Sequence, residues 1–235
     1  MRNIITASLM GLWAILGIAN AGDRPIVVVE LFTSQGCSSC PPADALLSAL
    51  AERSDVLALA LHVDYWDYIG WKDSFARPAH TDRQKAYARA AGRRTIYTPQ
   101  MIIGGMDDII GFKPMEVADY VQMNRERLGD VALKLQEDDG IMTVRAQPVG
   151  PAPLPGPIVV ELVHFTTSAT VDITRGENAG RSVTYSNIVT DIQVLAEWDG
   201  KSPLSLTAAV PGDGPVAVLL QARGPGAILA ARRLR

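Results

Sequence analysis

Cys37 and Cys40 are the only cysteines of the 235-residue chain, and two serines separate them. A Cys-x-x-Cys pair between a strand and a helix is typical of thiol–disulfide exchange, in which a thiolate attacks a sulfur–sulfur bond. We expect Cys37 to be the exposed attacking residue and Cys40 to resolve the mixed disulfide. Closing so short a loop removes little chain entropy, which disfavours a purely structural disulfide.

The residues around the pair predict how it is positioned. Residues 26–32 form a valine-rich apolar run, which indicates a buried strand. Pro41 and Pro42 fit the first turn of a helix that continues to Ala51. The positive end of that helix would favour the thiolate form of Cys37. Because a residue before proline avoids the helical region, we expect Cys40 to be extended.

A second apolar run, at residues 56–63, follows this helix after a short connection. Strand, helix and strand in this order predict a βαβ unit with parallel strands. Thr81 and Gln84 resemble a capping box that opens a helix through Ala91. Further along, a Gly-Gly turn predicts a hairpin between residues 101–103 and 109–110, and Pro114 begins another helix.

Thr98 and Pro99 precede the third predicted strand. With these two residues, the order of elements over about residues 24–128 resembles the thioredoxin superfamily. The resemblance implies that Pro99 follows a cis peptide bond beside the cysteines. It also implies that the backbone at Thr98 binds an extended peptide substrate as an added strand.

A closer resemblance is to a bacterial secreted, thioredoxin-like family of unknown function. It is carried by the signature ELFTSQGCSSCPPAD at residues 30–44 and by three shorter stretches. These are HVDYWD at 62–67, YTPQ at 97–100 and RGEN at 175–178. The match extends over most of the chain and implies a fold rather than a substrate.

The sequence pattern changes after Gly129. Short runs in which apolar residues alternate with polar ones are separated by clusters of Gly, Pro and Asp, which is typical of β-strands. The predicted fold is therefore an α/β thioredoxin-like domain, with a mixed sheet and helices on both faces, followed by an all-β, sandwich-like domain. We assign the first to residues 22–129, with a helical insertion at about 64–95. The β-rich domain is assigned to residues 130–235.

The N-terminus has the features of an export signal. Arg2 precedes an apolar stretch of about 15 residues, which is shorter than the roughly 20 needed to span a bilayer. Ala19-Asn20-Ala21 then offers a signal-peptidase site, so residues 1–21 are expected to be a signal peptide. The mature chain is expected to be periplasmic or secreted and to have no membrane span. The net charge of −3 over the full 235 residues argues against nucleic acid as a partner.

Four further residues are candidates for supporting roles: Asp44, His62, Asp64 and Trp66. Asp44 is interpreted as stabilising the free N–H groups at the helix start, with proton transfer as the alternative. Glu177, Asn178 and Tyr185 of the β half could approach the first half, but the sequence does not place them there.

The leading hypothesis is an exported thiol–disulfide oxidoreductase that uses its own redox-active disulfide and exchanges with a protein thiol or disulfide. The first alternative is copper or zinc binding by Cys37, Cys40 and His62. The second alternative is a non-enzymatic binding module with a thioredoxin-like fold. Enzymatic activity is therefore left open at this point.

Overall fold

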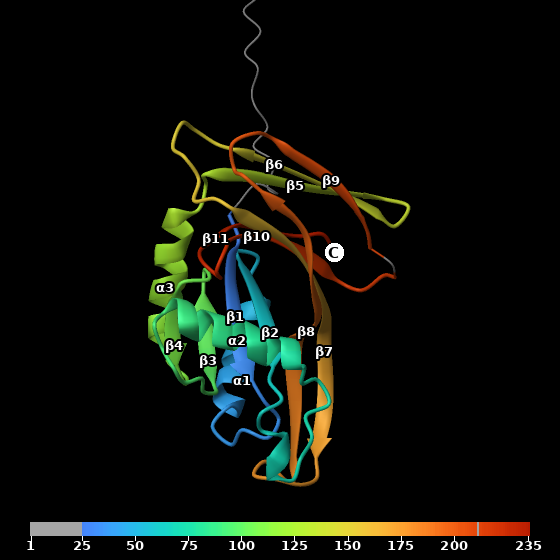
Figure 1. The fold of residues 1–235 in the computed structure, drawn as a ribbon. Coiled ribbons are helices and arrows are strands. Elements are labelled where there is room, and N and C mark those ends of the chain that lie inside the picture. The colour runs from blue at the N-terminus through green and yellow to red at the C-terminus, as the bar shows by residue number, and fades with distance from the viewer. Residues whose placement is uncertain (1–24, 211) are drawn as a thin grey trace, which may run out of the picture.

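The computed structural model describes residues 25–210 and 212–235, which form a mixed α/β fold with one large mixed sheet (Figure 1). Its helices are α1 (Pro41–Ala51), the 3-10 helix η2 (Asp67–Ile69), α2 (Pro78–Ala90) and α3 (Pro114–Arg127). The strands of the first half are β1 (Val27–Thr33), β2 (Val56–His62), β3 (Gln100–Ile103) and β4 (Asp107–Ile110). Those of the second half are β5 (Val131–Asp138), β6 (Ile141–Pro148), β7 (Ile158–Ile173), β8 (Arg181–Trp198), β9 (Leu204–Ala209), β10 (Val216–Ala222) and β11 (Ile228–Arg233).

The large sheet contains strands from both halves of the chain, in the order β11-β10-β7-β8-β2-β1-β3-β4. Strands β1 and β2 are parallel, as the βαβ pattern predicted. Strands β3 and β4 form the predicted antiparallel hairpin. The strands of the second half join the sheet where β8 lies beside β2, with Ile188 opposite Ala60.

Helices cover both faces of the sheet around β1, because successive side chains of a strand point to opposite faces. On one face, Val27, Val29 and Leu31 pack with apolar residues of α1 and α3. On the other face, Val28 and Phe32 pack with Tyr87 of α2 and with residues of β10 and β11. Cys40 therefore precedes a helix that packs against the sheet.

A smaller sheet, in the order β5-β6-β9, packs on β7 and β10 through the third apolar cluster. In Figure 1 it lies across the upper end of the molecule. The strands after Gly129 are thus divided between this sheet and the large one. A separate sandwich-like domain over residues 130–235 stays a prediction, as do the boundaries of the first domain.

Strands β7 and β8 are long, with 16 and 18 residues, although the sequence pattern after Gly129 predicts short strands. The exposed polar middle section of β7 pairs with β8 instead of forming a loop. Figure 1 shows the resulting hairpin descending from the small sheet to a turn at the opposite end of the molecule.

The predicted capping box at Thr81 is wrong. Helix α2 begins at Pro78, whose missing N–H costs nothing in a first turn, and Thr81 lies inside the helix. The predicted signal peptide, residues 1–21, lies outside the described residues. Within the described part of the chain, no helix is long and apolar enough to cross a membrane.

Candidate functional site

Cys37 and Cys40 form a disulfide bond, with their Cα atoms 5.4 Å apart. Cys40 is the N-cap residue of α1 and has helical dihedral angles, φ −78° and ψ −34°. The expectation that Pro41 keeps Cys40 extended is therefore wrong, because the Cys40 carbonyl accepts the N–H groups of Ala43 and Asp44 and so begins the helix. Since both prolines lack an N–H, this helix start offers few free donors to a Cys37 thiolate.

The disulfide is covered. Cys37 is 2% exposed and Cys40 is 0% exposed, so Cys37 is not the exposed thiol that the sequence led us to expect. The two serines between them, Ser38 and Ser39, face solvent. The Ser39 hydroxyl lies 3.4 Å from Cys37 Sγ and is placed to donate a hydrogen bond to that sulfur.

Two distant segments hold the backbone before Cys37. From the loop after β2, Asp73 accepts the Gln35 N–H at 2.8 Å, and Trp71 donates its ring N–H to Gln35 Oε1 at 2.8 Å. From the turn between β7 and β8, Asn178 donates to the carbonyl groups of Gln35 and Cys37, both at 2.9 Å. The cysteine loop is thus fixed by residues up to 143 positions away along the chain.

Trp66 connects the cysteine loop with Thr98 and Pro99. The Thr98–Pro99 peptide bond is cis, in agreement with what the thioredoxin resemblance implied. The Trp66 ring N–H donates to Thr98 Oγ1 at 2.7 Å. At its other end, Trp66 packs so closely on Gly36 that a Cβ there would lie 3.3 Å from Trp66 Cβ. Trp66 therefore contacts both the cysteine loop and the loop that contains Thr98 and Pro99.

Asp44 lies one helical turn after Cys40 and points into the protein. It is 4% exposed, and its Oδ1 accepts a hydrogen bond from Thr33 Oγ1 at 2.7 Å. Its Oδ2 has no partner among the described residues. Burial raises the pKa of Asp44 to about 7, although His62 and the Thr33 hydroxyl lower it. Asp44 is an acidic residue in the first turn of α1, and its stabilising role at the helix start stays a prediction.

His62 ends β2 and is 0% exposed. Its Nδ1 lies 2.8 Å from Asp73 Oδ2, and its Nε2 has no partner among the described residues. The ring packs edge-on against Phe75 and Tyr185, with centroids 5.2 and 4.8 Å apart. Tyr185 belongs to β8, so the second half of the chain closes this side of the site.

The remaining predicted residues have other partners. Asp64 accepts a 2.6 Å hydrogen bond from the hydroxyl group of Thr81, which ties the loop after β2 to α2. In the part of the chain that the structure describes, no three His, Cys, Asp or Glu side chains form a group that could hold a metal ion. Copper or zinc binding by Cys37, Cys40 and His62 stays a prediction.

Sequence reasoning missed Asp73 altogether and left Asn178 and Tyr185 without a position. Asp73 is buried between His62 and the Gln35 backbone, yet it lies in a loop whose only visible signal was its aromatic content. Asn178 belongs to the RGEN stretch, which was visible as a motif but had no assigned contact. Glu177, its neighbour in that stretch, faces solvent.

Comparisons with known proteins found one family model and two solved structures of similar fold, and the family has no known function. A family model described as "Protein of unknown function (DUF1223)" matches residues 28–221. A crystal structure of a protein from Agrobacterium tumefaciens, a structural genomics target, is 35% identical and has a TM-score of 0.77. That match covers 88% of this chain and 93% of the other. The comparison with curated proteins gave no match.

A more distant similarity is to the solved structure of HBP35 of Porphyromonas gingivalis. The two chains are 16% identical, the TM-score is 0.59, and the match covers 90% of this chain and 75% of the other. At this level of identity the similarity concerns the fold alone.

Proposed function

The chain belongs to the DUF1223 family of proteins of unknown function, and we propose that it is a thiol–disulfide oxidoreductase with a thioredoxin-like site. One observation carries the proposal: Trp66 links the loop of the Cys37–Cys40 disulfide to the cis peptide bond at Pro99. A disulfide at a helix start supplies the exchanging sulfurs. A cis-proline loop beside it offers a backbone edge for an extended peptide.

In the reduced protein, the Cys37 thiolate attacks one sulfur of a client disulfide, and the client's other sulfur leaves as a thiolate that takes up a proton. Cys40 then loses its proton and attacks Cys37 Sγ in the mixed disulfide. This step restores the Cys37–Cys40 bond and releases the second client thiolate. The client has gained two electrons and two protons, and the same steps in reverse donate the disulfide to a reduced client.

We propose that the Asp44 carboxyl group exchanges a proton with Cys40. The Asp44 N–H donates to the Cys40 carbonyl at 3.1 Å, so the two residues are one helical turn apart. A buried carboxyl group with a pKa of about 7 is present in both protonation states near neutral pH. It can therefore accept the proton when Cys40 attacks and return it when Cys40 leaves, and the acceptor is its unpartnered Oδ2.

The proposed compartment is outside the cytoplasm, either periplasmic or secreted, where protein disulfides persist. This part of the proposal rests on the expected signal peptide at residues 1–21. The proposed partner is a protein thiol or disulfide. The chain has no third cysteine for an internal relay, so electrons must pass directly between the partner and Cys37–Cys40.

The proposal is tested with Cys40→Ser, which retains the attacking thiol and removes the resolving one. This variant should accumulate mixed disulfides with partner proteins, separable by non-reducing electrophoresis and identified by mass spectrometry. Cys37→Ser is the matched control and should accumulate far fewer. No trapped partner, together with no exchange between the wild-type disulfide and glutathione, would overturn the redox assignment.

Two further measurements separate the alternative functions. Stoichiometric cuprous-ion binding whose affinity falls in His62→Gln would favour metal handling, because a redox protein has no need of His62 as a ligand. Unchanged partner binding and phenotype in the double variant Cys37→Ser/Cys40→Ser would favour a non-enzymatic module. If the protein is an oxidoreductase, it should show no stoichiometric cuprous-ion binding that depends on His62. Partner binding and phenotype should then be lost in the double variant.

A further inference from the structure

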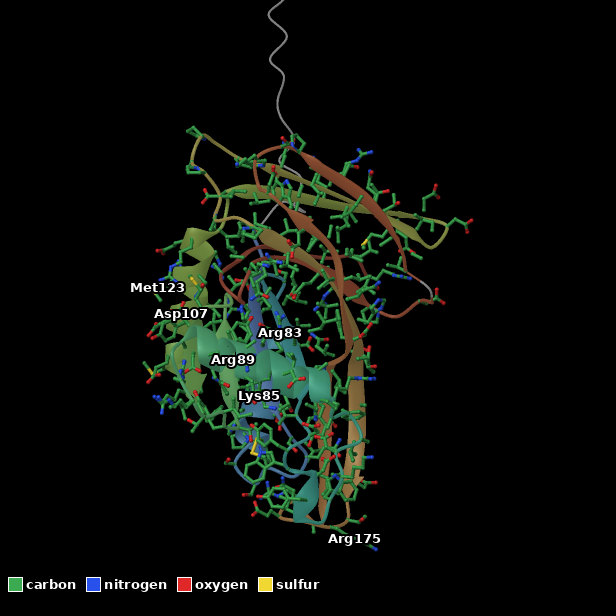
Figure 2. All side chains as sticks on the ribbon, viewed as in Figure 1. Arg83, Lys85, Arg89, Asp107, Met123 and Arg175 are labelled. Atoms are coloured by element: carbon green, nitrogen blue, oxygen red, sulfur yellow. A yellow bond between two sulfur atoms is a disulfide. The ribbon has the colours of Figure 1, made fainter. Side chains whose placement is uncertain are left out.

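The tip of the β7–β8 hairpin, residues 174–180, lies against the loop that covers the cysteines. Figure 2 labels Arg175 at this tip, at the far end of the molecule from the small sheet. Gly176 packs on Trp71, since a Cβ added there would lie 3.2 Å from Trp71 Cβ. The hairpin tip thus belongs to the redox site, although about 140 residues separate it from the cysteines in the sequence.

Asn178 is the residue of the tip that touches the redox loop. It is 1% exposed, and its Nδ2 donates to the carbonyl oxygens of Gln35 and Cys37, each at 2.9 Å. A side-chain amide has two N–H hydrogens, and this arrangement uses both of them. The Cys37 carbonyl also accepts the Cys40 N–H at 3.2 Å. Asn178 therefore clamps the peptide group that carries the attacking cysteine.

We propose that Asn178 is a positioning residue that keeps the Cys37–Cys40 disulfide covered, so that the hairpin tip sets the rate of its exchange with thiols. The inference rests on the proposed function in that it assumes an exchanging disulfide. Exchange requires an incoming sulfur to reach one sulfur of the bond, so its rate depends on access. With Cys37 at 2% exposure and Cys40 at 0%, the loop must open before a thiol can attack.

Opening of the loop breaks both hydrogen bonds of Asn178. The rest of the hairpin has its own attachments, which do not involve the cysteine loop. Ser186 bonds to Ser48 of α1 at 2.9 Å, and Asn187 donates to the Ala58 carbonyl at 2.9 Å. Removing the Asn178 amide should therefore release the cysteine loop while β8 stays docked. The open population, and with it the exchange rate, should rise about tenfold.

The test compares the rates at which dithiothreitol reduces the disulfide in the folded full chain. Asn178→Ala should be reduced about tenfold faster than wild type. Asn178→Asp should also be faster, because a carboxylate would face two carbonyl oxygens and repel them. Glu177→Ala, at the exposed neighbouring position, is the matched control and should remain within about twofold of wild type. Equal rates for Asn178→Ala and wild type would overturn the proposal.

Asn178 could affect the reduction rate only by changing the overall stability of the protein. Repeating the measurement at low urea concentrations distinguishes this effect from local opening of the cysteine loop. Local opening of the loop exposes little surface, so the rate should change little with urea, whereas exchange through global unfolding rises steeply. A steep dependence in Asn178→Ala would show that the variant is only less stable, and it would also overturn the proposal.

The same variants distinguish failure of this inference from failure of the proposed function. Faster reduction of Asn178→Ala by dithiothreitol, with no partner trapped by Cys40→Ser and no exchange between the wild-type disulfide and glutathione, would support the clamp and contradict the oxidoreductase. Trapped partners with unchanged reduction rates would support the oxidoreductase and contradict the clamp.

Discussion

Two buried polar clusters join the early and late parts of the chain. They differ in how many of their buried polar atoms have a hydrogen-bond partner. The Arg83 cluster comprises Glu30, Arg83, Tyr87, Glu161 and Gln221. Its guanidinium group donates to Glu30 at 2.6 Å, to Gln221 at 2.9 Å and to Glu161 at 3.0 Å. Figure 2 labels Arg83 on α2, from which it reaches β1, β7 and β10.

The cysteine-site cluster comprises Thr33, Asp44, His62, Asp73 and Asn178. Three of its buried polar atoms have no partner among the described residues: Asp44 Oδ2, His62 Nε2 and Asn178 Oδ1. In the Arg83 cluster the corresponding atom is Glu161 Oε2 alone. A buried polar atom without a partner costs about 1–3 kcal/mol, so the Arg83 cluster should contribute more to the stability of the fold than the cysteine-site cluster. The unpartnered atoms of the cysteine-site cluster are those that the proposed chemistry would use.

The largest expected effect is on the Arg83 cluster. Arg83→Met should lower the free energy of unfolding by about 3–5 kcal/mol, because it leaves Glu30 and Glu161 buried without their cation. Urea denaturation measures the change. Lys85→Met on the same helix is the control, since its contact with Asp82 is exposed at 3.5 Å and should contribute less than about 0.5 kcal/mol. Similar losses for the two variants would contradict the structural role of the cluster.

The second prediction concerns the pH dependence of stability through Asp44. Burial raises its pKa from 3.8 to about 7, so between these values the folded state binds more protons than the unfolded state. The contribution of Asp44 therefore destabilises the protein progressively as pH rises from about 4 to 7 and is constant above that. Each pH unit in this window costs on the order of 1 kcal/mol. Asp44→Asn should remove this slope, measured by urea denaturation at pH 4.5 and 7.5.

The effect of Asp44→Asn is measured as the difference in unfolding free energy between the variant and wild type at each pH. Burial lowers the pKa of His80 from 6.5 to about 4, so its contribution to stability is lost as pH falls through the same range. This opposite slope is present in both proteins and cancels in the difference. Identical pH profiles for wild type and Asp44→Asn would show that Asp44 has an ordinary pKa.

The smallest effect is expected for Thr33→Val, which removes the one side-chain hydrogen bond that the described residues donate to the Asp44 carboxyl group. Because that hydrogen bond favours the ionised carboxylate, its loss should raise the pKa of Asp44 further. The variant should lose about 2 kcal/mol at pH 8 and less at pH 4.5, where Asp44 is protonated. Tyr87→Phe, which removes a donor to Glu30 in the Arg83 cluster, is the comparison at the same two pH values. Equal losses at both pH values for Thr33→Val would contradict the assignment.

Local sequence signals predicted much of the first half. Pro41 marks the start of α1, and Pro114 the start of α3, because proline favours the first helical turn. Apolar runs located β1 and β2 to within a residue or two. Signals failed where a tertiary contact replaced a local one: Thr81 bonds to Asp64 instead of capping a helix.

The sequence by itself determined the chemistry that is available: one Cys-x-x-Cys pair, a proline before the third strand and a helix start at Pro41. Residue types and short-range periodicity are enough for those statements. Only the tertiary structure decided that the disulfide is covered, that Asp44 points inward and that Asn178 holds the Cys37 carbonyl. These features depend on contacts between segments far apart in the chain, and no local propensity encodes which distant backbone a buried amide will reach.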